Sequence, residues 1–205
     1  MSISYEESGR RNQKARTRAA LVEAARALLA GGVTPSVEAV AEAASISRAT
    51  AYRYFPNRET LLLAAHPEIE TESLLGPEPP SDPEARIDRV AAGLLDIYLA
   101  AEQTYRTMLR LSLESDVSDA RDPGLRKGRR YLWIREALEP VRERLGPVAF
   151  ERLVHGVAIT IGIEAVVALV DLGRLPREEA VEVMRWSARS LLKSALAEAE
   201  EGTPG

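Results

Sequence analysis

The stretch from residue 47 to residue 54 concentrates side chains that can bind DNA. Guanidinium groups can form paired hydrogen bonds with guanine, hydroxyl groups suit phosphates, and tyrosine rings can pack on thymine methyl groups. A helix capped by Ser47 would point most of these side chains outward. The outward set is Ser47, Arg48, Thr50, Tyr52, Arg53 and Tyr54. These residue types at this spacing predict a surface for double-stranded DNA, with base contacts centred on Arg48, Tyr52 and Arg53.

The residues on either side supply the elements that would hold this surface. Ser36 is a predicted N-cap, and the short helix that follows it has one apolar face. That face carries Val37, Val40, Ala41 and Ala44. Ser45-Ile46 forms a tight turn before the helix that Ser47 caps, and Asn57 caps a further helix in which Arg58 can reach a flanking phosphate. This spacing indicates a helix-turn-helix, whose second helix enters the major groove. A helical hairpin with a purely structural role is the alternative.

Residues 36–61 resemble the DNA-binding domain of the tetracycline-repressor (TetR) family. The most specific part is the run Tyr-x-Tyr-Phe-x-Asn-Arg-Glu-x-Leu at 52–61. The resemblance covers about residues 14–65 by motif, and the rest of the chain only by helix count and length. It implies a homodimeric repressor that binds a palindromic operator and releases it when a small ligand binds. The family's DNA contacts fall on Ser36, Ser47, Arg48, Ala49, Tyr52, Arg53, Tyr54 and Arg58.

Two positions depart from the family pattern. Ser45 stands in the turn where the family usually has glycine, and a positive φ there would cost serine about 1 kcal/mol. Ala51 stands where the family usually has a large aliphatic residue. Neither change removes a DNA contact, so we expect a slightly less tightly packed domain that keeps its DNA surface.

Composition and charge limit the other functions open to the chain. The 205 residues include no cysteine and two histidines, His66 and His155, which argues against a disulfide framework, thiolate metal sites and a His-rich metal centre. Residues 1–66 carry nine basic and six acidic side chains, whereas the remainder carries 18 and 25. A basic amino-terminal third suits a polyanionic partner. We expect no metal and no cofactor, and the polar residues after Met1 predict a cytoplasmic protein.

Apolar residues recur at helical spacing nearly throughout, which predicts an all-α fold of about nine helices. We expect a DNA-binding domain of three short helices at 1–66 and a helical ligand-binding and dimerisation domain at 67–205. The proline-rich segment 76–83 marks a boundary or a long loop. The apolar stretch 153–172 is long enough to span a membrane, but Glu164 near its centre would be costly there, by about 2–3 kcal/mol. A helix buried in a core or a subunit interface is the simpler interpretation, and no membrane partner is expected.

The carboxy-terminal domain is expected to hold a small, mostly apolar ligand between its helices. Apolar and aromatic residues at helical spacing, with polar groups on the helix predicted at 148–173, indicate the lining. The predicted lining is Leu94, Tyr98, Met108, Trp133, His155, Ile161 and Glu164. Each residue also has a packing interpretation, in which His155 and Glu164 form hydrogen bonds between helices or subunits.

A homodimer is expected through the last two long helices, because they carry more apolar surface than one small bundle can cover. The predicted interface row on the last helix is Val181, Met184, Ala188, Leu191 and Ala195. Helices from two subunits would then form a four-helix interface.

Two other classes of protein stay open. One is a helical dimerisation or interaction protein without specific DNA binding. The other is a helical enzyme, which the sequence disfavours because it has no phosphate-binding glycine loop, metal-ligand cluster or convincing nucleophile–base pair. Binding of random duplex DNA at low salt separates these classes, since phosphate neutralisation gives salt-dependent binding even without the right sequence.

Overall fold

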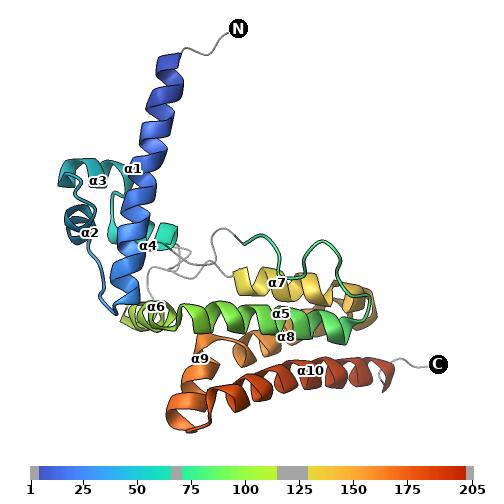
Figure 1. Cartoon of the computed structure of the whole chain (residues 1–205). Helices are drawn as coiled ribbons and strands as arrows, with labels where there is room; N and C mark the ends of the chain where they lie inside the picture. Colours follow the sequence, from blue (N-terminus) through green and yellow to red (C-terminus); the bar gives the residue numbers. More distant parts are fainter. Residues whose placement is uncertain (1–4, 66–70, 115–128, 202–205) are drawn as a thin grey trace. The chain divides into compact units, whose positions relative to one another are not determined.

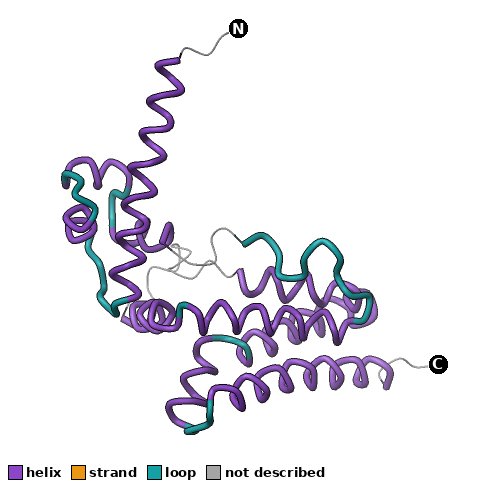
Figure 2. Tube along the Cα trace, in the orientation of Figure 1, coloured by secondary structure: helices purple, strands orange, loops and turns teal. Residues whose placement is uncertain are grey.

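A computed structural model describes residues 5–65, 71–114 and 129–201, and every regular element within these ranges is a helix (Figure 2). The helices are α1 (Tyr5–Ala30), α2 (Val37–Ala43), α3 (Arg48–Tyr54), α4 (Arg58–Ala65), α5 (Pro83–Ala100), α6 (Glu102–Glu114), α7 (Arg129–Leu138), α8 (Arg142–Thr160), α9 (Ile163–Val166) and α10 (Arg177–Glu201). The all-α class predicted from the apolar spacing is confirmed.

The helices divide between two compact units. The first contains α1 to α4 and, from Gln103 onward, α6; the second contains the segment before α5, α5 itself, and α7 to α10 (Figure 1). The predicted boundary between residues 66 and 67 lies outside the described residues and stays a prediction. A division there would assign α6 to the second domain, whereas α6 packs within the first unit.

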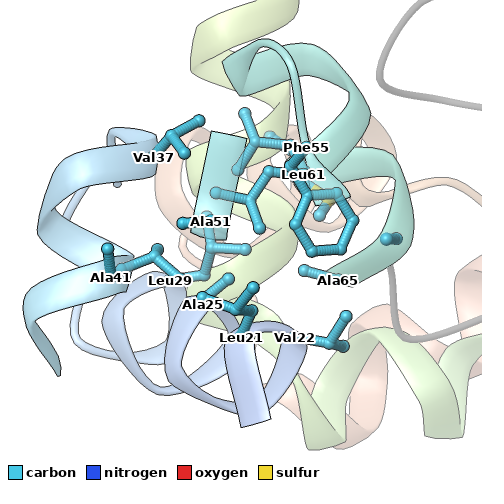
Figure 3. Close-up of a cluster of buried hydrophobic side chains, with 14 of the residues drawn as sticks. Leu21, Val22, Ala25, Leu29, Val37, Ala41, Ala51, Phe55, Leu61 and Ala65 are labelled. Atoms are coloured by element: carbon cyan, nitrogen blue, oxygen red, sulfur yellow. The ribbon is translucent and has the colours of Figure 1, made fainter. Parts of the chain in front are cut away.

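One hydrophobic cluster holds the first unit together. Side chains from α1, α2, α3 and α4 converge on it (Figure 3). Met108 and Leu111 of α6 belong to the same cluster, which explains why α6 is part of this unit. Ala51 lies on the inner side of α3 and Phe55 directly follows that helix. Their side chains are 0% and 3% exposed, so both are buried in the cluster. Complete burial of one phenylalanine side chain stabilises a fold by about 1.5–3 kcal/mol, so Phe55 is a main anchor of α3.

Polar side chains begin three of the short helices, as the sequence predicts. The side-chain oxygens of Ser36, Ser47 and Asn57 each accept the backbone N–H three residues further on, at 3.1, 3.3 and 2.9 Å. Each bond satisfies an N–H that would have no partner within its own helix. The caps therefore fix where α2, α3 and α4 start.

The turn between α2 and α3 requires one residue in the left-handed region. Ser45 has φ of 54°, and the Ile46 N–H then donates to the Ala41 carbonyl at 2.8 Å, which closes the end of α2. Glycine adopts this backbone without strain, whereas serine does not. The strain expected at Ser45 from the sequence is thus present.

In the second unit α10 packs along α8 and α5, and α7 packs on α5 and α8. The helix predicted at 148–173 is interrupted. α8 ends at Thr160, α9 starts after Gly162, and a π-helical turn follows at Val167–Leu172. In the described residues no single helix has the length and apolar character to cross a membrane; by those two criteria alone the bent pair Arg129–Thr160 and Ile163–Leu172 could.

The proline-rich segment is a loop of the second unit, held by arginine side chains. The Arg86 guanidinium donates to the carbonyls of Pro80, Glu136 and Ala137, at 2.8–3.1 Å. Further donors reach the loop from α5 and α7. They are Arg89 to Leu75 and Glu78, Arg129 to Thr71, and Trp133 to Glu72. Prolines leave carbonyls without helical partners, and these donors satisfy several of them.

Candidate nucleic-acid interface

The outer side of α3 is polar and exposed, while its inner side is buried. Ser47, Arg48, Ala49, Tyr52 and Arg53 are exposed, and Tyr52 retains 41% of its surface. Two further members of the predicted set, Thr50 and Tyr54, are half-buried. Ser36 and Arg58 are exposed at the starts of α2 and α4. The structure therefore brings the nine predicted DNA-binding residues onto three adjacent short helices of one unit.

The arginines of α3 keep their charge available. Within the described part of the chain, neither Arg48 nor Arg53 forms an ion pair with a carboxylate. The Arg53 guanidinium carbon lies 5.7 Å from the centre of the Tyr54 ring, a cation–π distance that leaves the polar edge of the guanidinium accessible. Arg58 lies at the outer limit of an ion pair with Glu59, at 4.0 Å. Exposed pairs of that kind are weak.

The hydroxyl groups at the start of α3 are used locally. Ser47 accepts the Thr50 N–H, and its hydroxyl donates to the Thr50 side-chain oxygen at 2.9 Å. The two bonds fix the first turn of α3 and so set the direction in which the side chains of Arg48 and Ala49 point. Ser47 and Thr50 therefore position the surface as well as lying on it.

Glu38 completes the surface, and sequence reasoning did not single it out. The Tyr52 hydroxyl donates to the Glu38 carboxylate, which joins α3 to the first turn of α2. This hydrogen bond lowers the pKa of Glu38 and raises the pKa of Tyr52. The two residues are 14 positions apart, so no helical or strand period connects them. The contact follows from the packing of α2 against α3.

These features define a helix-turn-helix DNA-binding domain: two short capped helices, a tight turn, and an exposed basic and aromatic face on the second helix. Residues 21–65 match the family described as bacterial regulatory proteins, tetR family. This region of the chain is thus similar to the TetR family, as the run at 52–61 predicts.

A curated relative agrees with this assignment. The chain is 37% identical over 95 residues to the HTH-type transcriptional repressor LfrR of Mycolicibacterium smegmatis. The match covers 44% of this chain and 49% of that protein, so the chain spans about half the length of the curated relative it matches. No solved structure matches the chain.

The residues predicted to line a ligand pocket are not all brought together. Leu94, Tyr98, Trp133 and Ile161 are buried in the second unit, each at most 3% exposed. Met108 instead belongs to the hydrophobic cluster of the first unit, because α6 packs there. The Trp133 indole N–H donates to the Glu72 carbonyl at 2.9 Å, which is the packing role that a buried tryptophan needs.

The two polar residues of the predicted lining have separate surroundings. His155 is exposed on α8, with Nδ1 2.7 Å from the Glu151 carbonyl and its ring 5.5 Å from that of Tyr131. Glu164 lies 3.1 Å from the guanidinium of Arg130, whose side chain is 12% exposed. A Cβ at Gly162 would fall 1.9 Å from that guanidinium, so the ion pair occupies the space beside this glycine and would have to shift for a larger residue.

Two grooves hollow the second unit. One, of about 700 Å³, is lined by Leu99, Glu102, Arg177, Glu178, Val181 and Glu182. The other, of about 400 Å³, lies between α8, α9 and α10, with Ile159, Glu164, Ala168, Leu169 and Val183 among its lining. Of the predicted ligand residues, Glu164 lines the second groove.

Most of the residues predicted to form the dimer interface on α10 instead face the core of the same chain. Met184, Ala188 and Ala195 are 1%, 0% and 9% exposed, because this side of α10 packs on α8 and α5. They are therefore unavailable to a second copy. Val181 and Leu191, the other members of the row, are half-buried. The apolar side chains that face outward are Ile159 on α8 and Val183 and Trp186 on α10, with 70%, 38% and 62% exposure.

Proposed function

We propose that this chain is a DNA-binding transcriptional repressor. The observation that carries the proposal is the face of α3, where Arg48, Tyr52 and Arg53 are exposed while Ala51 and Phe55 anchor the opposite side. Such a helix can enter the major groove without unpacking its own domain. The similarity to LfrR, a transcriptional repressor, supports the same function.

Selection of duplex DNA from a random pool tests this proposal. The wild-type chain should enrich one palindromic sequence, since a two-fold symmetric dimer reads two half-sites about 34–36 Å apart. Its affinity for that duplex should fall steeply with salt and exceed that for a shuffled duplex at every salt concentration. Binding that is salt-dependent but equal on both duplexes would reduce the function to non-specific DNA association. The absence of any binding at low salt would favour the interaction-protein alternative.

We further propose that the repressor is a homodimer joined through the outward faces of α8 and α10. Ile159 and Val183 line the same groove, and Trp186 lies one turn beyond Val183 on α10. Exposed large apolar residues gathered in this way are typical of protein interfaces. A self-complementary patch on two adjacent helices suits a two-fold axis.

Sedimentation of charge variants tests this interface. Ile159→Glu and Trp186→Glu should shift a dimer toward monomer, because each places a charge in an apolar contact. Leu113→Glu, at an equally exposed apolar position of α6, is the matched control and should leave the dimer intact. A wild-type monomer at micromolar concentration would refute the homodimer, and intact dimers in both variants would move the interface elsewhere.

We propose that a small, mostly apolar ligand releases the repressor by binding the second unit. Grooves of about 400 and 700 Å³ in this unit support the proposal, since ligand sites have such volumes. A releasing ligand must bind the non-DNA conformation better, typically by about 1–3 kcal/mol. The releasing ligand should therefore lower operator affinity while it raises thermal stability. Unchanged responses in both Tyr98→Phe and Trp133→Phe would place the pocket away from these two residues. A repressor released by no compound would be a constitutive binder.

A further inference from the structure

Glu38 lies at the edge of the DNA-facing surface and holds one of its central side chains. The Tyr52 hydroxyl donates its hydrogen bond to the Glu38 carboxylate. Glu38 is half-buried and Tyr52 is 41% exposed, so this bond restrains the phenol end of a side chain that is partly open to solvent. The positive charge of Arg48 also favours the ionised carboxylate of Glu38. One acidic group thus bonds to Tyr52 and interacts electrostatically with Arg48.

A carboxylate in this place has two effects on DNA binding. It repels phosphates, which weakens binding to every sequence. It also restricts the Tyr52 ring before DNA arrives, which reduces the side-chain entropy lost on docking.

The single proton of the Tyr52 phenol adds a constraint. While that proton is donated to Glu38, it cannot be donated to a phosphate. Tyr52 then presents its ring, and a ring in the major groove can pack on thymine methyl groups. Glu38 therefore turns Tyr52 from a phosphate contact, which carries no sequence information, into a base contact.

We propose that Glu38 is a positioning residue for sequence discrimination, acting through Tyr52. It orients the Tyr52 ring toward base edges and opposes binding to DNA that lacks the operator sequence. This inference rests on the proposed DNA-binding function and adds to it a residue that the motif at 52–61 does not contain.

The test compares affinities for two duplexes: the one that the wild-type chain selects from a random pool, and a shuffled duplex of the same length. The measured quantity is the ratio of the two affinities. The variants are Glu38→Ala, Glu38→Gln, Tyr52→Phe and the double variant Glu38→Ala/Tyr52→Phe. Glu42→Gln is the matched control, since it removes one acidic charge from an exposed position of the same helix.

Glu38→Ala should tighten binding to the shuffled duplex and lower the affinity ratio by about three- to tenfold, the range expected for one hydrogen bond. Glu38→Gln keeps an acceptor for the phenol, so it should bind both duplexes more tightly and retain the wild-type ratio. Tyr52→Phe should lower the ratio by a similar factor, and Glu38→Ala should add no further loss in that background. Glu42→Gln should leave the ratio unchanged.

A measurement without DNA separates this inference from the proposed function. The bond to Glu38 raises the pKa of Tyr52, so in Glu38→Ala the Tyr52 phenol should ionise at a lower pH than in the wild type. The ultraviolet absorbance of the phenolate measures this ionisation. The same substitution should produce no such change in the Tyr52→Phe background. Three results would each overturn the inference. They are an unchanged affinity ratio in Glu38→Ala, additive losses of the ratio in the double variant, and an unchanged phenol titration in Glu38→Ala. A wild-type chain that selects no sequence would refute the proposed function as well.

Discussion

Arginine has different surroundings in the two units. On α3 of the first unit, Arg48 and Arg53 are exposed and, among the described residues, neither pairs with a carboxylate. In the second unit, Arg185 and Arg189 both bond to Asp88, and Arg130 is nearly buried against Glu164. The same residue type therefore offers charge to a partner in one unit and joins helices in the other.

The role of an arginine in this chain therefore follows from its surroundings, and not from its position in the sequence. An exposed guanidinium without a carboxylate partner adds little to folding, and it remains available to phosphates and bases. A guanidinium shielded from water depends on its partner, because an uncompensated buried charge is costly. Substitutions in the two units should therefore separate loss of DNA binding from loss of stability.

The ion pair between Arg130 and Glu164 should contribute strongly to the stability of the second unit. Glu164→Ala should lower the free energy of unfolding by about 2–3 kcal/mol, because it leaves a guanidinium that is 12% exposed without its carboxylate. The effect is smaller than for a fully buried pair, since the Glu164 side chain is 39% exposed. Urea denaturation measures this change. Glu200→Ala, which breaks an exposed pair with Arg144, is the control and should change stability by less than about 1 kcal/mol. Equal effects of the two substitutions would contradict the distinction between shielded and exposed pairs.

The second effect concerns DNA binding alone. Arg48→Ala and Arg53→Ala should each weaken operator binding by about 1–3 kcal/mol and relax preference at one base position. Both should change the free energy of unfolding by less than about 0.5 kcal/mol, since they are surface positions. Arg144→Ala removes the same charge from the second unit and should leave operator affinity nearly unchanged. If both α3 variants kept wild-type affinity and sequence preference, α3 would not be the reading helix.

The third effect depends on pH. The hydrogen bond from Arg185, with a further one from Arg189, lowers the pKa of Asp88 below its ordinary value. A depressed pKa in the folded state gives stability that is complete above the unfolded pKa, about 3.9, and is lost as pH falls through the lower folded value. Asp88→Asn should cost about 1–2 kcal/mol at pH 7, and this difference should shrink below about pH 4.

Thermal unfolding of wild type and Asp88→Asn across this pH range measures the linkage. Glu198→Gln, at an exposed pair with Arg152, is the control and should show a small difference at all pH values. A difference between Asp88→Asn and wild type that stayed constant down to pH 2 would show that the carboxylate charge is not the cause.

Local signals in the sequence predicted the DNA-binding unit well. The caps at Ser36, Ser47 and Asn57 depend on residues three positions apart, and all are found in the structure. The positive φ at Ser45, also found, was suggested only by the glycine that the TetR family usually has at this position. The nine predicted DNA-binding residues lie on the helices expected, although their contacts with DNA stay predictions. Glu38 was missed because its contact with Tyr52 crosses between two helices.

The second unit was harder to predict, because apolar spacing shows which face of a helix is buried and not which helix buries it. The row that includes Met184 and Ala188 was assigned to a second subunit, yet α5 and α8 of the same chain cover it. Met108 has the spacing of a pocket residue, but α6 packs in the first unit. The sequence also carries no local signal that the side chains of Arg130 and Glu164 lie against Gly162.

The turn between α2 and α3 in the first unit should respond only slightly to substitution. Ser45 has φ of 54°, a left-handed conformation that costs an L-residue about 1–2 kcal/mol, while glycine adopts it freely. Glycine also gains entropy in the unfolded chain, which offsets about 0.5–1 kcal/mol of that relief. Ser45→Gly should therefore raise the free energy of unfolding by about 0.5 kcal/mol.

Ser45→Ala, which keeps the strain and lacks the hydroxyl, is the control and should give no gain. Because the turn fixes the angle between α2 and α3 in both proteins, operator affinity should stay at the wild-type value in Ser45→Gly. A loss of stability in this variant would mean that the serine side chain stabilises the turn by more than its backbone strains it.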